Sequence, residues 1–315
     1  MMKRRTFMVA ATAALAAVNA KSAAAEPRML GFNGYPLRVS SMDGSIGHRA
    51  DIRAFETAWK AGLDGIQLQY DPNLKNPNSL RHKKTMIAFR DAALQWNVQV
   101  NALCIGALGR TPLKSEPAGV TWVIEALQCA NFVGARVILL PILGDGHLQT
   151  EEEFKRLIAV LKELGPRAED HGVALGLECW VSGQDQVRIV EEVDSPGVRI
   201  YYDFHNAAYR GHDSLAETPL VGPYLCEVHV KNMNGRTGKF RMRDQGSFKI
   251  PTPAGRTRGL DHPALAAALN KAGYTGWLTL ENGIVGDDKI AAISDDVQYV
   301  REVYGSITAK RRPSS

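Results

Sequence analysis

Short apolar runs alternate with longer amphipathic segments along the chain from residue 30 onward. The apolar runs are typical of strands buried on both faces, and the longer segments repeat their apolar positions every three or four residues, as helices do. Glycines such as Gly62, Gly134 and Gly172 mark helix ends. The pattern predicts strands at 30–39, 65–70, 98–105, 136–141, 173–180, 198–206, 225–232 and within 273–283, and helices at 51–61, 79–96, 117–133, 150–171, 185–193, 214–221, 263–272 and 287–304.

Eight strands and eight helices in strict alternation predict a parallel sheet with crossover helices. The chain has 315 residues, 45% of them hydrophobic, which is enough for a sizeable core. Eight units within roughly 280 residues fit a closed barrel better than a doubly wound sheet. No GxGxxG motif follows the first strand, as a dinucleotide-binding fold would require. We therefore predict an α/β chain folded as one (β/α)8 TIM barrel, a single domain over residues 26–305.

Four consecutive predicted strands each end on a side chain that can bind a metal. They deliver Glu178, Asp203, His229 and Glu281 in turn, and the carboxyl ends of barrel strands meet at one mouth. Three carboxylates gathered there repel each other unless a divalent cation lies between them. Oxygen ligands with one nitrogen suit Mn²⁺, our first expectation, and also Mg²⁺, Co²⁺ or Zn²⁺. The sequence thus predicts a site for one divalent metal ion.

These motifs give the chain a resemblance to the xylose isomerase-like barrel superfamily, the sugar phosphate isomerases and epimerases. The resemblance implies that Glu178, Asp203, His229 and Glu281 hold one divalent metal. It also implies that the two glutamates are the catalytic acid and base. The matching residues cover roughly 30–304 and are clearest at the Glu178 strand, Tyr202-Asp203 with Asn206-Ala207, His229-Val230-Lys231, and Gly273-Tyr274 through Glu281.

The expected activity is metal-dependent sugar epimerisation or isomerisation, a reaction of carbohydrate metabolism. Strands five and eight lie three steps apart in a ring of eight, roughly 135° around the barrel. Glu178 and Glu281 can therefore reach opposite faces of a bound sugar. One glutamate removes an α-proton to give an enediolate, and the other returns a proton to the opposite face.

Further residues are predicted to contact the small carbohydrate substrate. Lys231 lies two residues beyond His229, and His205 two beyond Asp203, so each shares the inward face of its strand. For Lys231 the alternative is a salt bridge at the barrel mouth, and for His205 a loop histidine. The complete set of predicted substrate-binding residues is Lys231, His205, Asn206 and Gln67.

The chain departs from the family pattern at several positions, which leaves other functions open. Gln67 stands where strand two commonly ends on a glutamate, and Gly255–Gly259 reads GRTRG where many members carry Gly-Glu-Gly. A metal-dependent lyase or hydratase acting on 3-keto-glycosides, or an exported non-catalytic sugar-binding protein, remain alternatives. The related apurinic endonuclease barrels need several further histidines, and Asn206 stands where one would be expected.

The distribution of charge argues against a nucleic-acid partner. The net charge is +5, but residues 1–25 carry +4 and residues 310–312 carry +3, which leaves the body near −2. The stretch 232–260 is different, with seven lysines and arginines against Asp244 alone. A long loop after a barrel strand is functional or a solvated surface loop, and a functional one would favour an anionic substrate.

The first 25 residues form a predicted twin-arginine signal peptide. Arg4-Arg5 precedes the alanine-rich apolar run 9–18, and Ala23-Ala24-Ala25 offers a cleavage site. The run is too short for an ordinary membrane span, so no stable insertion is expected after cleavage. A disordered basic arm is the alternative. We predict export by the twin-arginine machinery to the periplasm or medium. At the other end, residues 306–315 are predicted to be a basic, disordered tail. The sequence leaves homo-oligomerisation open.

Export supplies the first test. Replacing both Arg4 and Arg5 by lysine should retain the protein in the cytoplasm, because the export machinery reads the paired arginines. Cell fractionation followed by immunoblotting measures this, with the double replacement of Arg311 and Arg312 by lysine in the tail as the charge-matched control. An unchanged periplasmic yield in the Arg4/Arg5 variant would contradict the predicted address.

Overall fold

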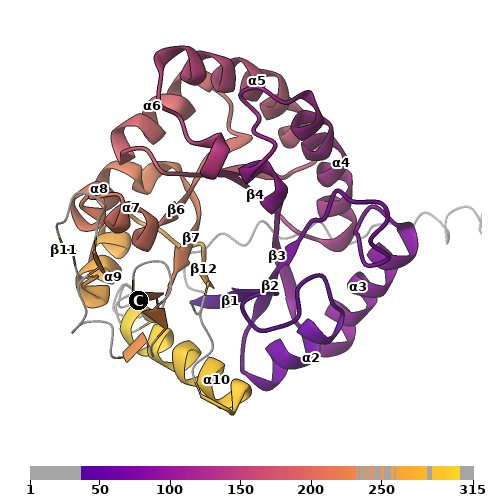
Figure 1. Cartoon of the computed structure of the whole chain (residues 1–315). Helices are drawn as coiled ribbons and strands as arrows, with labels where there is room; N and C mark the ends of the chain where they lie inside the picture. Colours follow the sequence, from indigo (N-terminus) through magenta and orange to yellow (C-terminus); the bar gives the residue numbers. More distant parts are fainter. Residues whose placement is uncertain are drawn as a thin grey trace, which may run out of the picture. The chain divides into compact units, whose positions relative to one another are not determined.

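Eight parallel strands close into a barrel in the order β1-β12-β7-β6-β5-β4-β3-β2, as Figure 1 shows in the view along the barrel axis. The predicted (β/α)8 TIM barrel is confirmed. This computed structural model describes residues 37–231, 233–234, 238–239, 242–243, 250–251, 257–258, 260–281 and 286–305. The barrel strands are β1 (Arg38–Met42), β2 (Gly65–Gln69), β3 (Gln99–Cys104), β4 (Val137–Ile142), β5 (Ala174–Cys179), β6 (Val198–Asp203), β7 (Leu225–Val230) and β12 (Trp277–Leu280).

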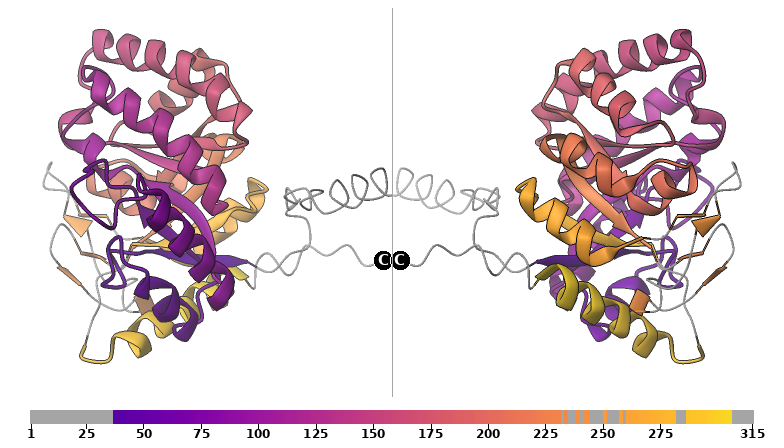
Figure 2. Two further views of the ribbon diagram at one scale, coloured as in Figure 1. Left: turned by 90° about the vertical axis from the view of Figure 1, so that its right-hand side faces the viewer. Right: turned by 90° about the vertical axis from the view of Figure 1, so that its left-hand side faces the viewer.

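The helices lie around the outside of the barrel (Figure 2). In α5, Thr150 and Glu153 make the reciprocal capping box expected from the sequence TEEE. Short single turns, η1 (Gly106–Gly109), η2 (Gly144–Gly146) and η3 (Gly222–Tyr224), lie in the connections, and η5 (Arg301–Gly305) follows the last helix. The α-helices are α2 (Arg53–Lys60), α3 (Lys83–Trp96), α4 (Pro117–Val133), α5 (Glu151–Asp170), α6 (Gly183–Val193), α7 (Phe204–Tyr209), α8 (Ser214–Val221), α9 (His262–Lys271) and α10 (Lys289–Val300).

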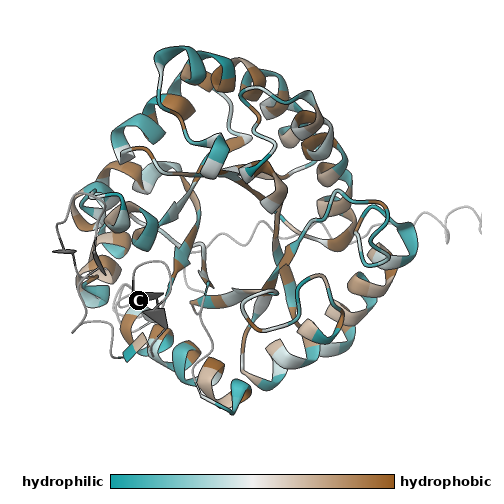
Figure 3. Cartoon of the chain, in the orientation of Figure 1, coloured by the Kyte–Doolittle hydropathy of each residue, from teal (hydrophilic) through white to brown (hydrophobic). Residues whose placement is uncertain are grey.

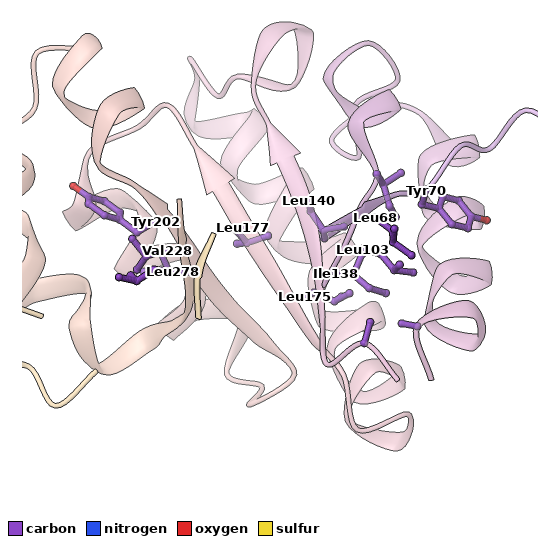
Figure 4. Packing of buried hydrophobic residues seen from close by; sticks show 14 of the residues in the cluster. Leu68, Tyr70, Leu103, Ile138, Leu140, Leu175, Leu177, Tyr202, Val228 and Leu278 are labelled. Carbon is purple, nitrogen blue, oxygen red and sulfur yellow. The ribbon is translucent and has the colours of Figure 1, made fainter. Parts of the chain in front are cut away.

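Alternation along each strand divides the core into two parts. Side chains such as Leu103, Leu175 and Val228 belong to the main core, which includes the buried faces of the helices (Figure 4). The alternate residues of β3, β4 and β6 form a second, smaller cluster that contains Cys104 and Tyr201. Figure 3 shows hydrophobic and hydrophilic residues on the same helices, as expected of helices with one face against a barrel.

The first strand is displaced from its predicted position. We expected it to end at Val39, but β1 continues to Met42, and the part of the prediction before residue 37 lies outside the described residues. The two added serines, Ser40 and Ser41, form hydrogen bonds within the barrel wall. The Ser40 and Thr279 hydroxyl oxygens lie 2.7 Å apart, and the Ser41 hydroxyl donates to the Leu280 carbonyl at 3.0 Å.

A short helix replaces the predicted end of the sixth strand. We expected a strand to Asn206, but β6 ends at Asp203 and α7 begins at Phe204. The Asp203 carboxylate caps α7 by accepting a hydrogen bond from the Asn206 backbone N–H at 2.8 Å. The helix predicted from Ser79 begins instead at Lys83, because the Ser79 hydroxyl donates to the Asp71 carbonyl in a preceding turn.

Only parts of the basic stretch 232–260 are described. They form two short antiparallel pairs, β8 (Met233–Asn234) with β9 (Gly238–Lys239) and β10 (Ile250–Pro251) with β11 (Thr257–Arg258). Arg243 pairs with Asp295 and Glu302 beside α10, so this one cation has a structural role. The predicted signal peptide at 1–25 and the tail at 306–315 lie outside the described residues. No helix in the described part of the chain has the length and apolarity to cross a bilayer.

Candidate metal centre

Four side chains from neighbouring strands converge at the carboxyl mouth of the barrel. Glu178 on β5, Asp203 on β6, His229 on β7 and Glu281 directly after β12 each offer one ligand atom, and these atoms all lie within 4.8 Å of one another. The first three residues are buried, whereas 31% of the Glu281 side chain is exposed. The structure thus brings together the four residues that the sequence placed at a metal site.

The His229 imidazole is oriented as a metal ligand would be. Its Nδ1 atom lies 3.6 Å from Glu178 Oε1, 3.7 Å from Asp203 Oδ2 and 3.3 Å from Glu281 Oε2, and it makes no hydrogen bond among the described residues. Its Nε2 atom lies 3.0 Å from Gln67 Oε1, which can only accept a hydrogen. In the neutral ring the hydrogen therefore sits on Nε2, and the lone pair of Nδ1 points among the three carboxylates.

Lys231 is buried beside the same carboxylates. Its ammonium lies 2.7 Å from Asp203 Oδ2 and 3.0 Å from Glu281 Oε2. Three carboxylates and one ammonium leave two net negative charges, which one divalent cation balances. The donor set of three oxygens and one imidazole nitrogen fits such a cation.

The pKa shifts report a strongly negative field around His229. Burial alone would lower the pKa of His229, but Asp203 and Glu178 outweigh it and raise that pKa to about 10. Burial alone would raise the pKa of Asp203, but Lys231 and His229 hold it well below its usual range. Burial raises the pKa of Glu178, against the opposing charges of His229 and Lys231. The field that favours a proton here also favours a metal cation.

Three predicted substrate-binding residues lie close to these ligands. Asn206 is half-buried, and its side-chain amide donates to Glu178 Oε1 at 2.7 Å. Lys231 makes the ion pairs that we weighed as its alternative role, and its contact with substrate stays a prediction. His205 is buried on α7 with its ring stacked parallel to that of Tyr209, 6.4 Å between centroids. This burial gives His205 less access to a substrate than Asn206 has.

Gln67 lies behind His229, and it does not line the open mouth. It is fully buried on β2, its Oε1 accepts from His229 Nε2, and its Nε2 donates to the Tyr201 hydroxyl at 3.2 Å. Both ends of the amide are thereby used within the protein. We therefore assign Gln67 to orienting the imidazole, a role that the sequence reading did not give it.

A buried polar layer continues from Gln67 deeper into the barrel. The Tyr201 hydroxyl donates to the Glu227 carboxylate at 2.9 Å, which also accepts from Asn101 at 2.9 Å and Thr279 at 3.1 Å. Burial raises the pKa of Glu227 to about 7, although these three donors oppose the shift. The sequence reading missed this layer, yet Tyr201, Glu227 and Thr279 each precede a ligand by two residues and so share its inward face.

Replacing Gln67 by leucine should weaken Mn²⁺ binding by about 10- to 100-fold, because the imidazole loses the acceptor that fixes its tautomer. Titration calorimetry of the protein with Mn²⁺ measures the effect. Replacing Gln186 by leucine is the control, since Gln186 is an equally buried glutamine that donates to the Val181 carbonyl. An unchanged Mn²⁺ affinity in folded Gln67→Leu would contradict the orienting role.

Relatives of this chain and similar solved structures include epimerases and a dehydratase. A 2-epi-5-epi-valiolone 7-phosphate 2-epimerase of Actinoplanes is 26% identical over 69% of this chain and 80% of its own. An inosose dehydratase of Geobacillus thermodenitrificans is 26% identical over 52% of this chain and 59% of its own. The crystal structure of an E. coli 3-keto-D-glucoside 4-epimerase, 18% identical, superimposes with a TM-score of 0.63 over 84% of this chain and 99% of its own.

The family assignment is broader than any single relative. The sequence profile described as xylose isomerase-like TIM barrel matches residues 55–303, most of the barrel and its surrounding helices. The closed eight-stranded barrel agrees with that description. The chain therefore belongs to the xylose isomerase-like TIM barrel family.

Proposed function

We propose that the protein is a divalent-metal-dependent sugar epimerase or isomerase. The observation that carries this proposal is the arrangement of three carboxylates around the Nδ1 atom of the His229 imidazole. The epimerases among the relatives support the same reaction class. Mn²⁺ is the metal that we propose first, because it accepts both carboxylate oxygen and imidazole nitrogen.

Two glutamates of the site are placed to move protons. A divalent cation held by the four ligands would supply Lewis-acid polarisation of a substrate carbonyl. Glu178 lies on β5 and Glu281 directly after β12, and β6 and β7 separate these two strands in the barrel, so the glutamates approach a bound sugar from different sides. One glutamate takes the α-proton to leave an enediolate, and the other returns a proton to the opposite face, which inverts the carbon.

Each glutamate is fixed by a neighbouring side chain. Asn206 donates to one oxygen of Glu178, and Lys231 pairs with one oxygen of Glu281. Fixing one oxygen orients the whole carboxylate, so the second oxygen has a defined direction toward the substrate. Lys231 and Asn206 thus act as positioning residues in this proposal, whether or not they also touch the sugar.

Dehydration is the second candidate, and the inosose dehydratase among the relatives favours it. The same base would remove the α-proton, and loss of a β-hydroxyl would then replace proton return. A lyase acting on 3-keto-glycosides would use the same first step, and a hydratase would run that elimination in reverse by adding water to the double bond. Mass spectrometry of the products separates these reactions, because an epimerase conserves mass and a dehydratase product is lighter by one water. A non-catalytic sugar-binding protein would bind sugar without exchanging any carbon-bound hydrogen.

We also propose that the protein works outside the cytoplasm. The support is the twin-arginine pattern at Arg4-Arg5 ahead of an alanine-rich segment. Export through that route carries folded proteins, which suits a barrel that acquires its metal before crossing the membrane. The substrate would then be a sugar or sugar derivative present in the periplasm or medium.

The purified mature protein should hold about one divalent metal ion per chain. Replacing His229 by alanine should remove most of it, because the remaining carboxylates lose the nitrogen ligand on which they converge. Elemental analysis after dialysis measures the occupancy. His171→Ala is the control, since His171 bonds the Arg167 carbonyl at the end of α5, away from the four ligands. Full occupancy in His229→Ala would refute the ligand set.

Replacing Glu281 by glutamine should lower exchange of the substrate α-hydrogen by about 10²- to 10⁴-fold, because an amide is not a base at neutral pH. Glutamine keeps an oxygen that can bind the cation, so metal binding should suffer less than in Glu281→Ala. The measurement is deuterium uptake from D₂O by NMR, across keto sugars and keto-glycosides with Mn²⁺.

The surface carboxylate Glu191, which bonds the Tyr224 hydroxyl, provides the control variant Glu191→Gln. It should exchange hydrogen at the wild-type rate. Near-wild-type turnover in Glu281→Gln with metal bound would reduce Glu281 to a ligand and exclude the two-glutamate mechanism. Following inversion and exchange together in Glu178→Gln shows which glutamate serves which face of the sugar.

A further inference from the structure

A second group of side chains gathers at the same face of the barrel, and the proposed chemistry does not use it. We call Trp180, Arg210 and His147 the rim cluster. Trp180 follows β5, Arg210 follows α7 after β6, and His147 follows η2 after β4. Three neighbouring strand-to-helix connections therefore contribute one residue each. Connections of this kind carry the binding groups of barrel enzymes.

The rim cluster adjoins the candidate metal centre through the chain itself. Trp180 lies two residues beyond Glu178, so their Cα atoms are at most about 7 Å apart. Arg210 ends the short helix α7, which begins at the residue after Asp203. Two of the three members are thus tied to ligand-bearing strand ends.

The Arg210 guanidinium stacks on the Trp180 ring, with Cζ 3.5 Å from the ring centroid. The His147 ring meets the Trp180 ring edge-on at 5.8 Å between centroids. Stacking on the indole holds the guanidinium plane in one orientation. Its N–H donors, which lie in that plane, are then preorganised for a ligand.

Arg210 differs from the stacked Arg188 and Arg243 because it has no anionic partner among the described residues. Arg188 lies over Phe154 and pairs with Glu151 and Glu192. Arg243, as noted above, pairs with two carboxylates beside α10. Arg210 makes no hydrogen bond or ion pair with any residue in the described part of the chain, and its Nε atom is buried. A buried donor without a partner is unfavourable unless a ligand supplies the acceptor.

The groups around Arg210 leave it as the unpaired cation. Lys114 donates to the His147 carbonyl at 2.7 Å but is itself paired with Glu153 at 2.6 Å, and the Nδ1 atom of His147 is buried without a hydrogen-bond partner in the described residues. Burial lowers the pKa of His147, and the charges of Arg210 and Lys114 lower it further, against the opposing charge of Glu153. The cluster therefore presents the N–H donors of one cation, Arg210, beside an imidazole whose lowered pKa favours the neutral form.

We propose that Trp180, Arg210 and His147 form a subsite for an oxyanion substituent of the sugar, a carboxylate or a phosphate. Guanidinium groups bind both through paired hydrogen bonds. The inference rests on the proposed function for the position of the sugar, whose reacting carbon lies at the candidate metal centre. Substrates would then be acidic or phosphorylated sugars, and neutral analogues would bind more weakly.

Binding measurements test the subsite without requiring turnover. Titration calorimetry of the Mn²⁺-loaded protein would compare methyl glucoside, methyl glucuronide and glucose 6-phosphate. At least one anionic sugar should bind about ten-fold or more tightly than the neutral one, as expected for charge-assisted hydrogen bonds. The anion that shows this preference identifies carboxylate or phosphate as the natural substituent.

Variants of Arg210 test whether this residue causes the preference for anionic over neutral sugars. Arg210→Gln should reduce the affinity ratio between anionic and neutral sugars to within about two-fold. Arg210→Lys should retain part of this ratio, because lysine keeps the charge but lacks the paired N–H donors of the guanidinium. Arg188→Gln is the matched control, since it removes the same charge from another stacked arginine and should leave the preference intact.

Several outcomes would overturn the inference. One is that neither anionic sugar binds more tightly than methyl glucoside. Another is that Arg210→Gln leaves the preference unchanged. A third is that this variant weakens the binding of neutral and anionic sugars equally, which would mean that Arg210 only supports Trp180. Failure of the proposed function looks different: the anion preference would survive in a protein that exchanges no hydrogen in D₂O.

Discussion

Mutual repulsion among three carboxylates is the constraint on which the rest of this site depends. Glu178, Asp203 and Glu281 surround one imidazole nitrogen, and all but Glu281 are buried. Charges in such surroundings must be compensated by hydrogen bonds, opposite charge or metal. The protein supplies the first two through Asn206 and Lys231. The two negative charges that remain are the number that one divalent cation would balance.

The buried polar layer beneath the ligand residues fixes the orientation of His229. An ionised Glu227 can only accept hydrogens, so the Tyr201 hydroxyl donates to it and in turn accepts from the Gln67 amide. That amide presents its oxygen to His229, which fixes the hydrogen on Nε2. Gly176, two residues before Glu178, leaves room for Tyr201, because a Cβ there would lie 3.1 Å from Tyr201 Cβ. Donation thus runs in one direction, from His229 Nε2 through Gln67 and Tyr201 to Glu227 in the barrel interior, and it leaves Nδ1 facing the carboxylates.

In the proposed reaction, the four ligand residues and the rim cluster have separate roles. Proton removal beside a carbonyl is common to epimerisation and dehydration, so one ligand set serves either reaction. In barrel enzymes the groups that recognise the rest of a substrate lie on the connections after the strands, where sequence varies without disturbing the barrel. Trp180 and Arg210 lie on such connections here, and Arg210 has no acidic partner in the described part of the chain.

The sequence by itself determined the barrel and its four ligand-bearing strand ends. Strand–helix alternation and apolar runs that end on Glu178, Asp203, His229 and Glu281 are local patterns, and the closure of eight parallel strands brings such ends together. The role of Gln67 was decided only by the tertiary structure, because contact with His229 requires strands 162 residues apart to face each other across the barrel. The same holds for α7, where the Asp203 side chain caps a helix in a segment whose apolar residues read as strand. Local pattern fixes which way a side chain faces, whereas its partner depends on how distant strands are brought together.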